Sequence, residues 1–142
     1  MKKRAITLLE VMIVILLIGI IGGVVSYNLK GTLDKGKAFS SKEGAHKLQD
    51  ILNLELQLTS TKVDDLIGSS GVNQSNVEKC VIQSGLVSNA RAFVKDGWKE
   101  PYTIVRGKDN TVRVWSSRSK AYYKKHNLSD ENDDEETDLH AH

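Results

Sequence analysis

An apolar run near the amino terminus constrains this chain more than any other feature of its sequence. The run extends from Ile6 to Val25, and apart from glycines only Thr7 and Glu10 interrupt it. As a helix it would be about 30 Å long, close to the thickness of the hydrocarbon core of a bilayer. The sequence therefore predicts one membrane-spanning helix, followed by about 115 residues that form a single small domain.

The residues before the run indicate its orientation. Lys2, Lys3 and Arg4 precede it, and by the positive-inside rule they stay in the cytoplasm, so the carboxyl-terminal domain is exported. On composition alone three simpler interpretations compete: a cleaved secretory signal with its cleavage site at 24–26, a plain signal anchor, and a buried core helix. The length and uniform apolarity of the run argue against the core helix.

Glu10 distinguishes between these alternatives. A carboxylate inside an apolar run costs about 2.5–3.5 kcal/mol at the centre of a membrane and less near its surface. Neither a cleaved signal nor an inert anchor has a reason to carry such an acid. If the chain is cut between Ala5 and Ile6, the new α-amino group lies four residues before Glu10. Its positive charge would then offset much of the cost of burying the carboxylate.

These residues resemble the class III signal of type IV pilins and of the pseudopilins of type II secretion. The resemblance is carried by Lys-Lys-Arg-Ala at 2–5, by Ile-Thr-Leu-Leu-Glu at 6–10 and by the apolar stretch that follows. It implies that a prepilin peptidase cuts between Ala5 and Ile6 and methylates the new amino terminus of Ile6. It also implies that Glu10 pairs with the amine of a neighbouring subunit during assembly. Ala5 replaces the family's usual Gly, and Ile6 replaces its usual Phe.

Helix packing and helix length can also be estimated from this part of the sequence. Gly19 and Gly23 form a Gly-x-x-x-Gly pair that would let helices approach closely, although the pattern is common by chance in apolar segments. Beyond the run, apolar residues continue near 3.6-residue spacing, so we expect helix to about residue 59. Leucines that alternate over 52–58 are also compatible with a strand.

The middle of the chain predicts short helices separated by loops. A helical turn is expected at Val63–Ile67, ended by the Gly-Ser-Ser-Gly stretch at 68–71. Ser75 is a candidate cap for a second helix over 76–84, with Gly85 as its stop.

The clearest strand pattern lies further along. Tyr102–Arg106 and Thr111–Trp115 alternate in polarity on either side of Gly-Lys-Asp-Asn, which predicts an antiparallel hairpin. The preceding Asp-Gly-Trp-Lys-Glu-Pro-Tyr at 96–102 predicts a tight turn with a buried aromatic side chain. It also resembles, in part, the Asp-Pro-Trp-Gly-x-Pro-Tyr stretch of G-type major pseudopilins. The expected fold is therefore α+β and pilin-like: a long amino-terminal helix, membrane-spanning in its first half, packed on a small antiparallel sheet.

The two signs of charge are segregated along the chain. Residues 130–138 hold seven acids and no base, so the overall net charge of +2 leaves +9 for the rest. Residues 91–125 hold ten Lys or Arg against three acids. Because aromatic residues are few and the bases alternate along the expected strands, we expect a solvated face and no nucleic-acid site. This basic region and a neighbouring subunit's acidic tail form a candidate contact.

The acidic tail raises the question of calcium, because G-type pseudopilins bind one Ca²⁺ in a loop after the sheet. Clustered oxygen ligands are what calcium needs, and Asp133, Asp134 and Asp138 are the weak candidates here. The chain has no glycine after residue 107 to let the backbone fold round an ion. An acidic run is usually a solvated segment, so we expect no cofactor and a disordered tail over 129–142.

Chemistry of other kinds has little support in the sequence. The four histidines, His46, His126, His140 and His142, fit no catalytic arrangement with a nucleophile, and no Gly-rich phosphate loop follows a strand. We therefore expect no enzyme activity. Cys80 is the one cysteine, so it forms no intramolecular disulfide, and we expect it in the apolar core.

Together the motifs divide the chain into a class III leader at 1–5, a transmembrane assembly helix at 6–26, a periplasmic head at 27–128 and the tail. The resemblance implies a single-pass inner-membrane protein that forms homopolymers as the major pseudopilin of a type II secretion system. Its partners would be the prepilin peptidase, other pseudopilins and inner-membrane secretion components. The alternatives are a type IV pilus or DNA-uptake pilin and, in another class, a signal-anchored periplasmic binding module.

Overall fold

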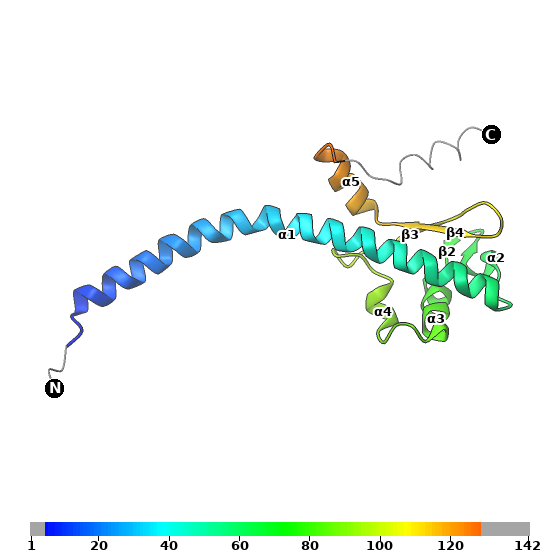
Figure 1. Cartoon of the computed structure of the whole chain (residues 1–142), viewed down its shortest axis with the longest axis horizontal. Helices are drawn as coiled ribbons and strands as arrows, with labels where there is room; N and C mark the ends of the chain where they lie inside the picture. The colour runs from blue at the N-terminus through cyan, green and yellow to red at the C-terminus, as the bar shows by residue number, and fades with distance from the viewer. Residues whose placement is uncertain (1–4, 129–142) are drawn as a thin grey trace. The chain divides into compact units, whose positions relative to one another are not determined.

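The computed structural model describes residues 5–128 of the chain, which forms two units. The first unit ends at Lys35 and the second begins at Gly36. Helix α1 (Leu8–Leu58, 51 residues) contributes its first part to one unit and its second part to the other (Figure 1). The expected helix to about residue 59 is thus confirmed.

Only the second part of α1 has a buried face. Its buried residues recur every three or four positions, as one side of a helix requires: Ala38, Ser41, Ala45, Leu48, Ile51, Leu52, Glu55 and Leu56. The alternating leucines over 52–58 resolve into two faces, since Leu52 and Leu56 are buried while Leu54 and Leu58 are exposed. The helical interpretation of this segment is therefore correct and the strand interpretation is wrong.

Short elements follow α1 in the second unit. They are α2 (Val63–Leu66), β1 (Ile67–Gly68), β2 (Gly71–Val72), α3 (Gln74–Ser84), α4 (Ala90–Phe93), β3 (Thr103–Arg106), β4 (Val112–Trp115) and α5 (Ser117–Lys125). The predicted turn of helix at α2 and the predicted hairpin of β3 and β4 are confirmed. The small β1–β2 pair and the helices α4 and α5 were not predicted.

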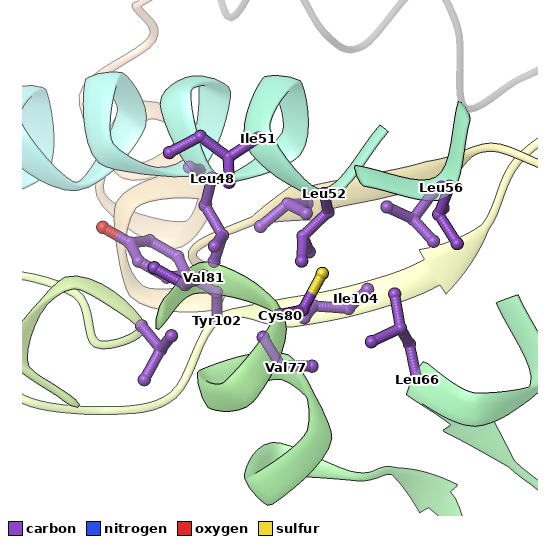
Figure 2. Close-up of a cluster of buried hydrophobic side chains, with 14 of the residues drawn as sticks. Leu48, Ile51, Leu52, Leu56, Leu66, Val77, Cys80, Val81, Tyr102 and Ile104 are labelled. Carbon is purple, nitrogen blue, oxygen red and sulfur yellow. The ribbon is translucent and has the colours of Figure 1, made fainter. Parts of the chain in front are cut away.

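The apolar core lies between α1, α3 and the β3–β4 hairpin (Figure 2). Leu48 and Leu52 of α1 are fully buried, as are Val77 and Val81 of α3. Burying a leucine or valine side chain contributes about 1.5–3 kcal/mol. Cys80 is 3% exposed within this core, as its apolar neighbours predicted.

Gly44 in α1 makes room for one core side chain. A Cβ atom at this position would come within 2.4 Å of the hydroxyl oxygen of Tyr102. Tyr102 is 5% exposed, so its ring has little freedom to move away. Glycine lowers the stability of a helix relative to alanine. Here it is favoured because a larger residue at position 44 would clash with the Tyr102 hydroxyl.

The hairpin follows from its turn residues. Asp109 and Asn110 both have positive φ angles, 57° and 59°, and the amide of Thr111 donates to the carbonyl of Lys108. Positive φ at both central positions defines a type I′ turn, which matches the twist of paired strands and favours Asn and Asp. The register pairs Ile104 with Val114, and both side chains are buried.

Side-chain amides of α1 cover the outer edge of β4. Asn53 donates to the carbonyl of Val112 at 3.1 Å and accepts from the amide of the same residue at 2.8 Å. One turn earlier, the side-chain oxygen of Gln49 accepts from the amide of Val114 at 3.0 Å. The backbone groups that a strand edge would leave unpaired are thus satisfied by the helix.

The start of α3 differs from the sequence expectation. Its N-cap is Asn73, whose side chain accepts from the amide of Asn76, so the predicted cap at Ser75 is wrong. Asn caps a helix as well as Ser does, and Asn73 has the extended backbone that a cap needs. The predicted stop is confirmed, because Gly85 adopts the left-handed conformation with φ 68°.

We expect Asn53→Ala to lower the free energy of unfolding by about 1–3 kcal/mol, because it leaves the amide and carbonyl of Val112 without partners. Urea denaturation of the full chain in detergent, followed by tryptophan fluorescence, measures this. Asp50→Ala, an exposed change in the same helix, is the matched control and should stay within about 0.5 kcal/mol of the parent. Equal stabilities of the two variants would contradict the proposed edge contact.

Two core side chains make the free energy of unfolding depend on pH in the alkaline range. Burial, assisted by the charge of Glu55, raises the pKa of the Cys80 thiol from 9.0 to about 11. Burial, assisted by the charge of Asp96, raises the pKa of Tyr102 from 10.0 to about 12. The unfolded chain therefore releases these protons at lower pH than the folded chain does. The free energy of unfolding should fall as the pH rises from 9 towards 12.

The Cys80→Ala variant should lose the part of this decline that begins near pH 9, and Tyr102→Phe the part that begins near pH 10. Denaturation at a series of pH values, compared with the parent chain, checks both. If the free energy of unfolding falls with pH equally in the parent and the variants, the two groups ionise alike in the folded and unfolded chains, which would contradict the prediction.

Candidate functional site

The amino-terminal end of α1 is closed by a reciprocal pair of hydrogen bonds. The amide of Glu10 donates to the hydroxyl oxygen of Thr7, and the amide of Thr7 donates to the carboxylate of Glu10, both at 3.3 Å. This is a capping box of the Thr-x-x-Glu type. In this motif each side chain accepts a hydrogen bond from a backbone amide that has no partner within the helix. The Thr-x-x-Glu pattern is readable in the sequence, although the expectation for Glu10 rested on its charge alone.

The bond predicted to be cut lies just before this cap. Ala5, Ile6 and Thr7 are not helical, and all three are exposed. Ile6 keeps 75% of its surface open to solvent. The Ala5–Ile6 peptide bond is therefore in accessible, non-helical chain, which is the form a peptidase needs.

The first part of α1 exposes apolar side chains on all sides. Large apolar residues from Ile6 to Leu33 are each at least 45% exposed within the structure. By length and composition the helix is apolar enough to cross a membrane. An apolar helix without a polar face needs lipid or other protein around it. A Cβ atom at Gly19 or Gly23 would meet nothing within 4 Å, so both glycines face open space.

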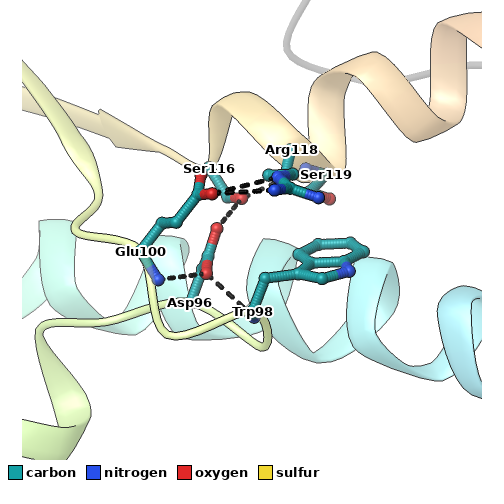
Figure 3. A network of polar contacts seen from close by, with 6 residues as sticks. All are labelled: Asp96, Trp98, Glu100, Ser116, Arg118 and Ser119. Carbon is teal, nitrogen blue, oxygen red and sulfur yellow. Dashed lines mark hydrogen bonds and ion pairs between the residues drawn. The ribbon is translucent and has the colours of Figure 1, made fainter.

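A buried carboxylate organises the loop that precedes the hairpin (Figure 3). Asp96 is 7% exposed, and one of its oxygens accepts from the amides of Trp98 and Glu100, both at 2.9 Å. Its other oxygen accepts from the hydroxyl of Ser116 at 2.7 Å. The Ser116 oxygen in turn caps α5 by accepting from the amide of Ser119.

Two serines fasten this loop and α5 to α1. The hydroxyl of Ser41 donates to the carbonyl of Lys37 and accepts from the amide of Gly97 at 2.8 Å. The hydroxyl of Ser119 donates to the carbonyl of Ala38 at 2.7 Å. A Cβ atom at Gly97 would lie 3.0 Å from the Lys37 carbonyl oxygen, so the close approach favours glycine.

The sequence located the loop at 96–102 but missed its chemistry. The predicted tight turn is present, with Lys99 at a φ angle of 65°. The buried aromatic side chain of the stretch is Tyr102, which is 5% exposed, while Trp98 is only half-buried. The signals available were an Asp before Gly, which favours a side-chain-to-backbone turn, and a Ser directly after a strand, which favours a helix cap.

The predicted calcium candidates Asp133, Asp134 and Asp138 lie outside the described residues, as does the tail expected to be disordered. Within residues 5–128, no three His, Cys, Asp or Glu side chains gather closely enough to hold a metal ion. The predicted site residues that the structure does describe, Ala5, Ile6, Glu10, Gly19 and Gly23, lie in α1 or just before it.

Comparison with known proteins adds three findings. Residues 1–26 match the family model of the prokaryotic N-terminal methylation motif. A Chlamydia pneumoniae protein named "Putative outer membrane protein" is 32% identical over 87% of this chain and 96% of its own length. A protein of the same name from Chlamydia trachomatis serovar D is 30% identical over 82% of this chain and 90% of its own. No solved structure matches the chain.

Proposed function

Because the chain belongs to the family of these chlamydial proteins and begins with a type IV pilin-like methylation motif, we propose that it is the major pseudopilin of a type II secretion system. As a type IV pilin-like precursor it is a structural subunit, processed at its amino terminus and assembled through α1. The relatives' names state outer membrane location for those proteins and nothing about secretion.

The observation that carries the proposal is the position of Glu10. It is an acid at the start of an otherwise apolar helix, five positions into the chain that would remain after cleavage at Ala5. Cleavage would create a positive amine at Ile6, which a neighbouring subunit's Glu10 could bind. Pairing of the two opposite charges lowers the cost of keeping each in an apolar surrounding, so subunits that pair are retained in the filament.

Two features of the second unit favour a secretion pseudopilin over a pilus subunit. The loop at 96–102 resembles the stretch leading into the sheet of G-type pseudopilins, and its Asp96 fixes that loop to the rest of the unit. The one cysteine, Cys80, is buried in the apolar core, whereas many type IV pilins close a carboxyl-terminal loop with a disulfide.

The proposed location is the inner membrane, with the lysines and arginine of the leader in the cytoplasm and the second unit in the periplasm. A filament that grows outward from the inner membrane would bring subunits towards the outer membrane, which is compatible with the relatives' names. The proposed partners are the prepilin peptidase, further copies of the chain, other pseudopilins and inner-membrane secretion components.

Mass spectrometry of the protein purified from its native cells tests the processing. We expect a chain that begins at Ile6 and carries one methyl group on its amine. A chain that keeps Met1, or one that begins near Tyr27 after removal of the apolar run, would contradict the proposal. The same measurement separates it from a signal-anchored binding module, which keeps its leader.

The assembly role of Glu10 can be separated from its capping role. Glu10→Gln keeps a capping box, since Gln serves as well as Glu in that motif, but it removes the charge. We expect this variant to insert into the membrane normally and to enter filaments at least about tenfold less, because it leaves a neighbour's amine unpaired. Chemical crosslinking of cells, followed by immunoblotting of oligomers, measures incorporation.

The matched control is Thr7→Ala, which removes the hydroxyl of the capping box and keeps the acid. It should assemble far better than Glu10→Gln. Normal assembly of Glu10→Gln together with poor assembly of Thr7→Ala would show that Glu10 acts only as a helix cap.

A further inference from the structure

Three lysines at the loop over 96–102 are exposed and have no acidic partner. Lys95 lies directly before the loop and Lys99 lies within it. Lys37 of α1 adjoins the same loop, since a Cβ atom at Gly97 would be 3.1 Å from the Cβ atom of Lys37. All three are exposed, and within residues 5–128 their ammonium groups take part in no ion pair. We call Lys37, Lys95 and Lys99 the loop lysines.

The acids of this loop are already engaged by other groups. Asp96 is buried, and its two oxygens accept hydrogen bonds from two backbone amides of the loop and from the hydroxyl of Ser116. Glu100 pairs with Arg118 at 2.9 Å. The positive charge of the loop lysines is therefore not neutralised by the loop itself, and it remains available to an anionic partner.

The backbone conformation at Lys99 is unusual for a lysine. Its φ angle is 65°, and the other three non-glycine residues with positive φ in the described part of the chain are Asn or Asp. Asn and Asp tolerate this conformation, and glycine adopts it without strain. A strained residue whose exposed charge has no partner in its own unit points to a role for that side chain outside the unit.

Trp98 adds an aromatic side chain between these charges. It is half-buried, and Figure 3 shows its ring extending from the turn, away from Asp96 and Glu100. A tryptophan ring has an apolar body and a polar N–H group, so it is well suited to the boundary between lipid and water. A half-buried tryptophan flanked by exposed lysines is typical of a surface that lies against lipid headgroups.

The sequence keeps this surface close to the membrane. The residues between Glu10 and Lys30 carry no charge, and seven positions separate Lys30 from Lys37. Because α1 is helical throughout, those seven positions correspond to about 10 Å along the helix. The headgroup layer is about 5–7 Å thick on each side of a bilayer, and its charge acts over about 8 Å more at physiological ionic strength. Lys37 is thus within reach of headgroup charge.

We propose that the loop lysines and Trp98 bind the anionic phospholipid headgroups of the membrane in which α1 is anchored. The three ammonium groups pair with lipid phosphates, and the ring of Trp98 enters the headgroup layer. The interaction belongs to the single subunit, so it depends neither on filament assembly nor on a role in secretion.

The test uses the full chain reconstituted in lipid vesicles and reads the fluorescence of Trp98. Trp115→Phe leaves Trp98 as the one tryptophan of the chain. A phosphatidylcholine that carries a nitroxide on its headgroup quenches a tryptophan that lies among the headgroups. We expect quenching about twofold stronger in vesicles that contain phosphatidylglycerol than in phosphatidylcholine alone, with the difference shrinking as salt is raised.

Removal of charge locates the surface. In the Trp115→Phe chain, Lys37→Gln, Lys95→Gln and Lys99→Gln together should reduce quenching in phosphatidylglycerol vesicles to the level found in phosphatidylcholine alone. Lys99→Gly serves if that triple variant does not fold, because glycine relieves the strained backbone. It should raise the midpoint of urea unfolding and still lower the quenching that depends on phosphatidylglycerol.

The matched control changes the same amount of charge elsewhere in the second unit. Lys62→Gln, Lys79→Gln and Lys108→Gln are three exposed positions away from the loop, and together they should leave the quenching of Trp98 as it is in the Trp115→Phe chain.

Three results would overturn the proposal. The first is equal quenching of Trp98 with and without phosphatidylglycerol. The second is unchanged quenching after replacement of the loop lysines, which would assign their charge to a protein partner. The third is an equal loss in the loop-lysine variant and in the control, which would indicate general attraction between a basic chain and an anionic membrane.

Discussion

The burial of one face of α1 is the interaction on which the rest of the second unit depends. Leu48, Leu52 and Leu56 recur at four-residue spacing and are covered by the core. The other elements that the structure describes, up to residue 128, are all shorter: α3 has 11 residues, α5 has nine, α2 and α4 have four, and no strand there has more than four. Helices and hairpins of that length are marginal by themselves in water. They become stable here because a helix that already extends through the unit gives them an apolar surface to pack on.

Polar contacts then fix how these elements sit on the helix. Gln49 and Asn53 are one turn apart, about 6 Å along the helix axis, and Val114 and Val112 are two positions apart, about 6.7 Å along the strand. Because the two spacings nearly match, the amides can satisfy both backbone positions at once when helix and strand run in opposite directions. A shift of the strand by one residue would break both contacts and turn its buried valines outward. The helix thus takes the place of a third strand and also sets the register.

The features that could be predicted from the sequence are those that leave a pattern within a short stretch of chain. The helix, the hairpin and the buried Cys80 each follow from periodicity or turn residues within a short window. The contact of Asn53 with Val112 joins residues 59 positions apart, and an exposed-looking amide in a helix carries no sign of its partner. Helix α5 was missed because its many bases suggested a solvated face, and its cap at Ser116 is supported by Asp96, 20 positions earlier. Hydrogen bonds between residues so far apart in the sequence cannot be predicted from a local pattern, because only the fold brings the two residues together.

Glu10 combines a local role that the structure shows, as part of the cap of α1, with the assembly role that we propose for it. In the uncut chain its carboxylate accepts the amide of Thr7, at the helix end where the backbone dipole already favours a negative charge. Cleavage at Ala5 would place an amine next to that amide and add a full positive charge to a site that is already positive. The capping bond is long at 3.3 Å, so an ammonium group from a neighbouring subunit competes with a weak hydrogen bond. On the proposed mechanism, the first turn can therefore hold the carboxylate before assembly and release it to a partner with little loss.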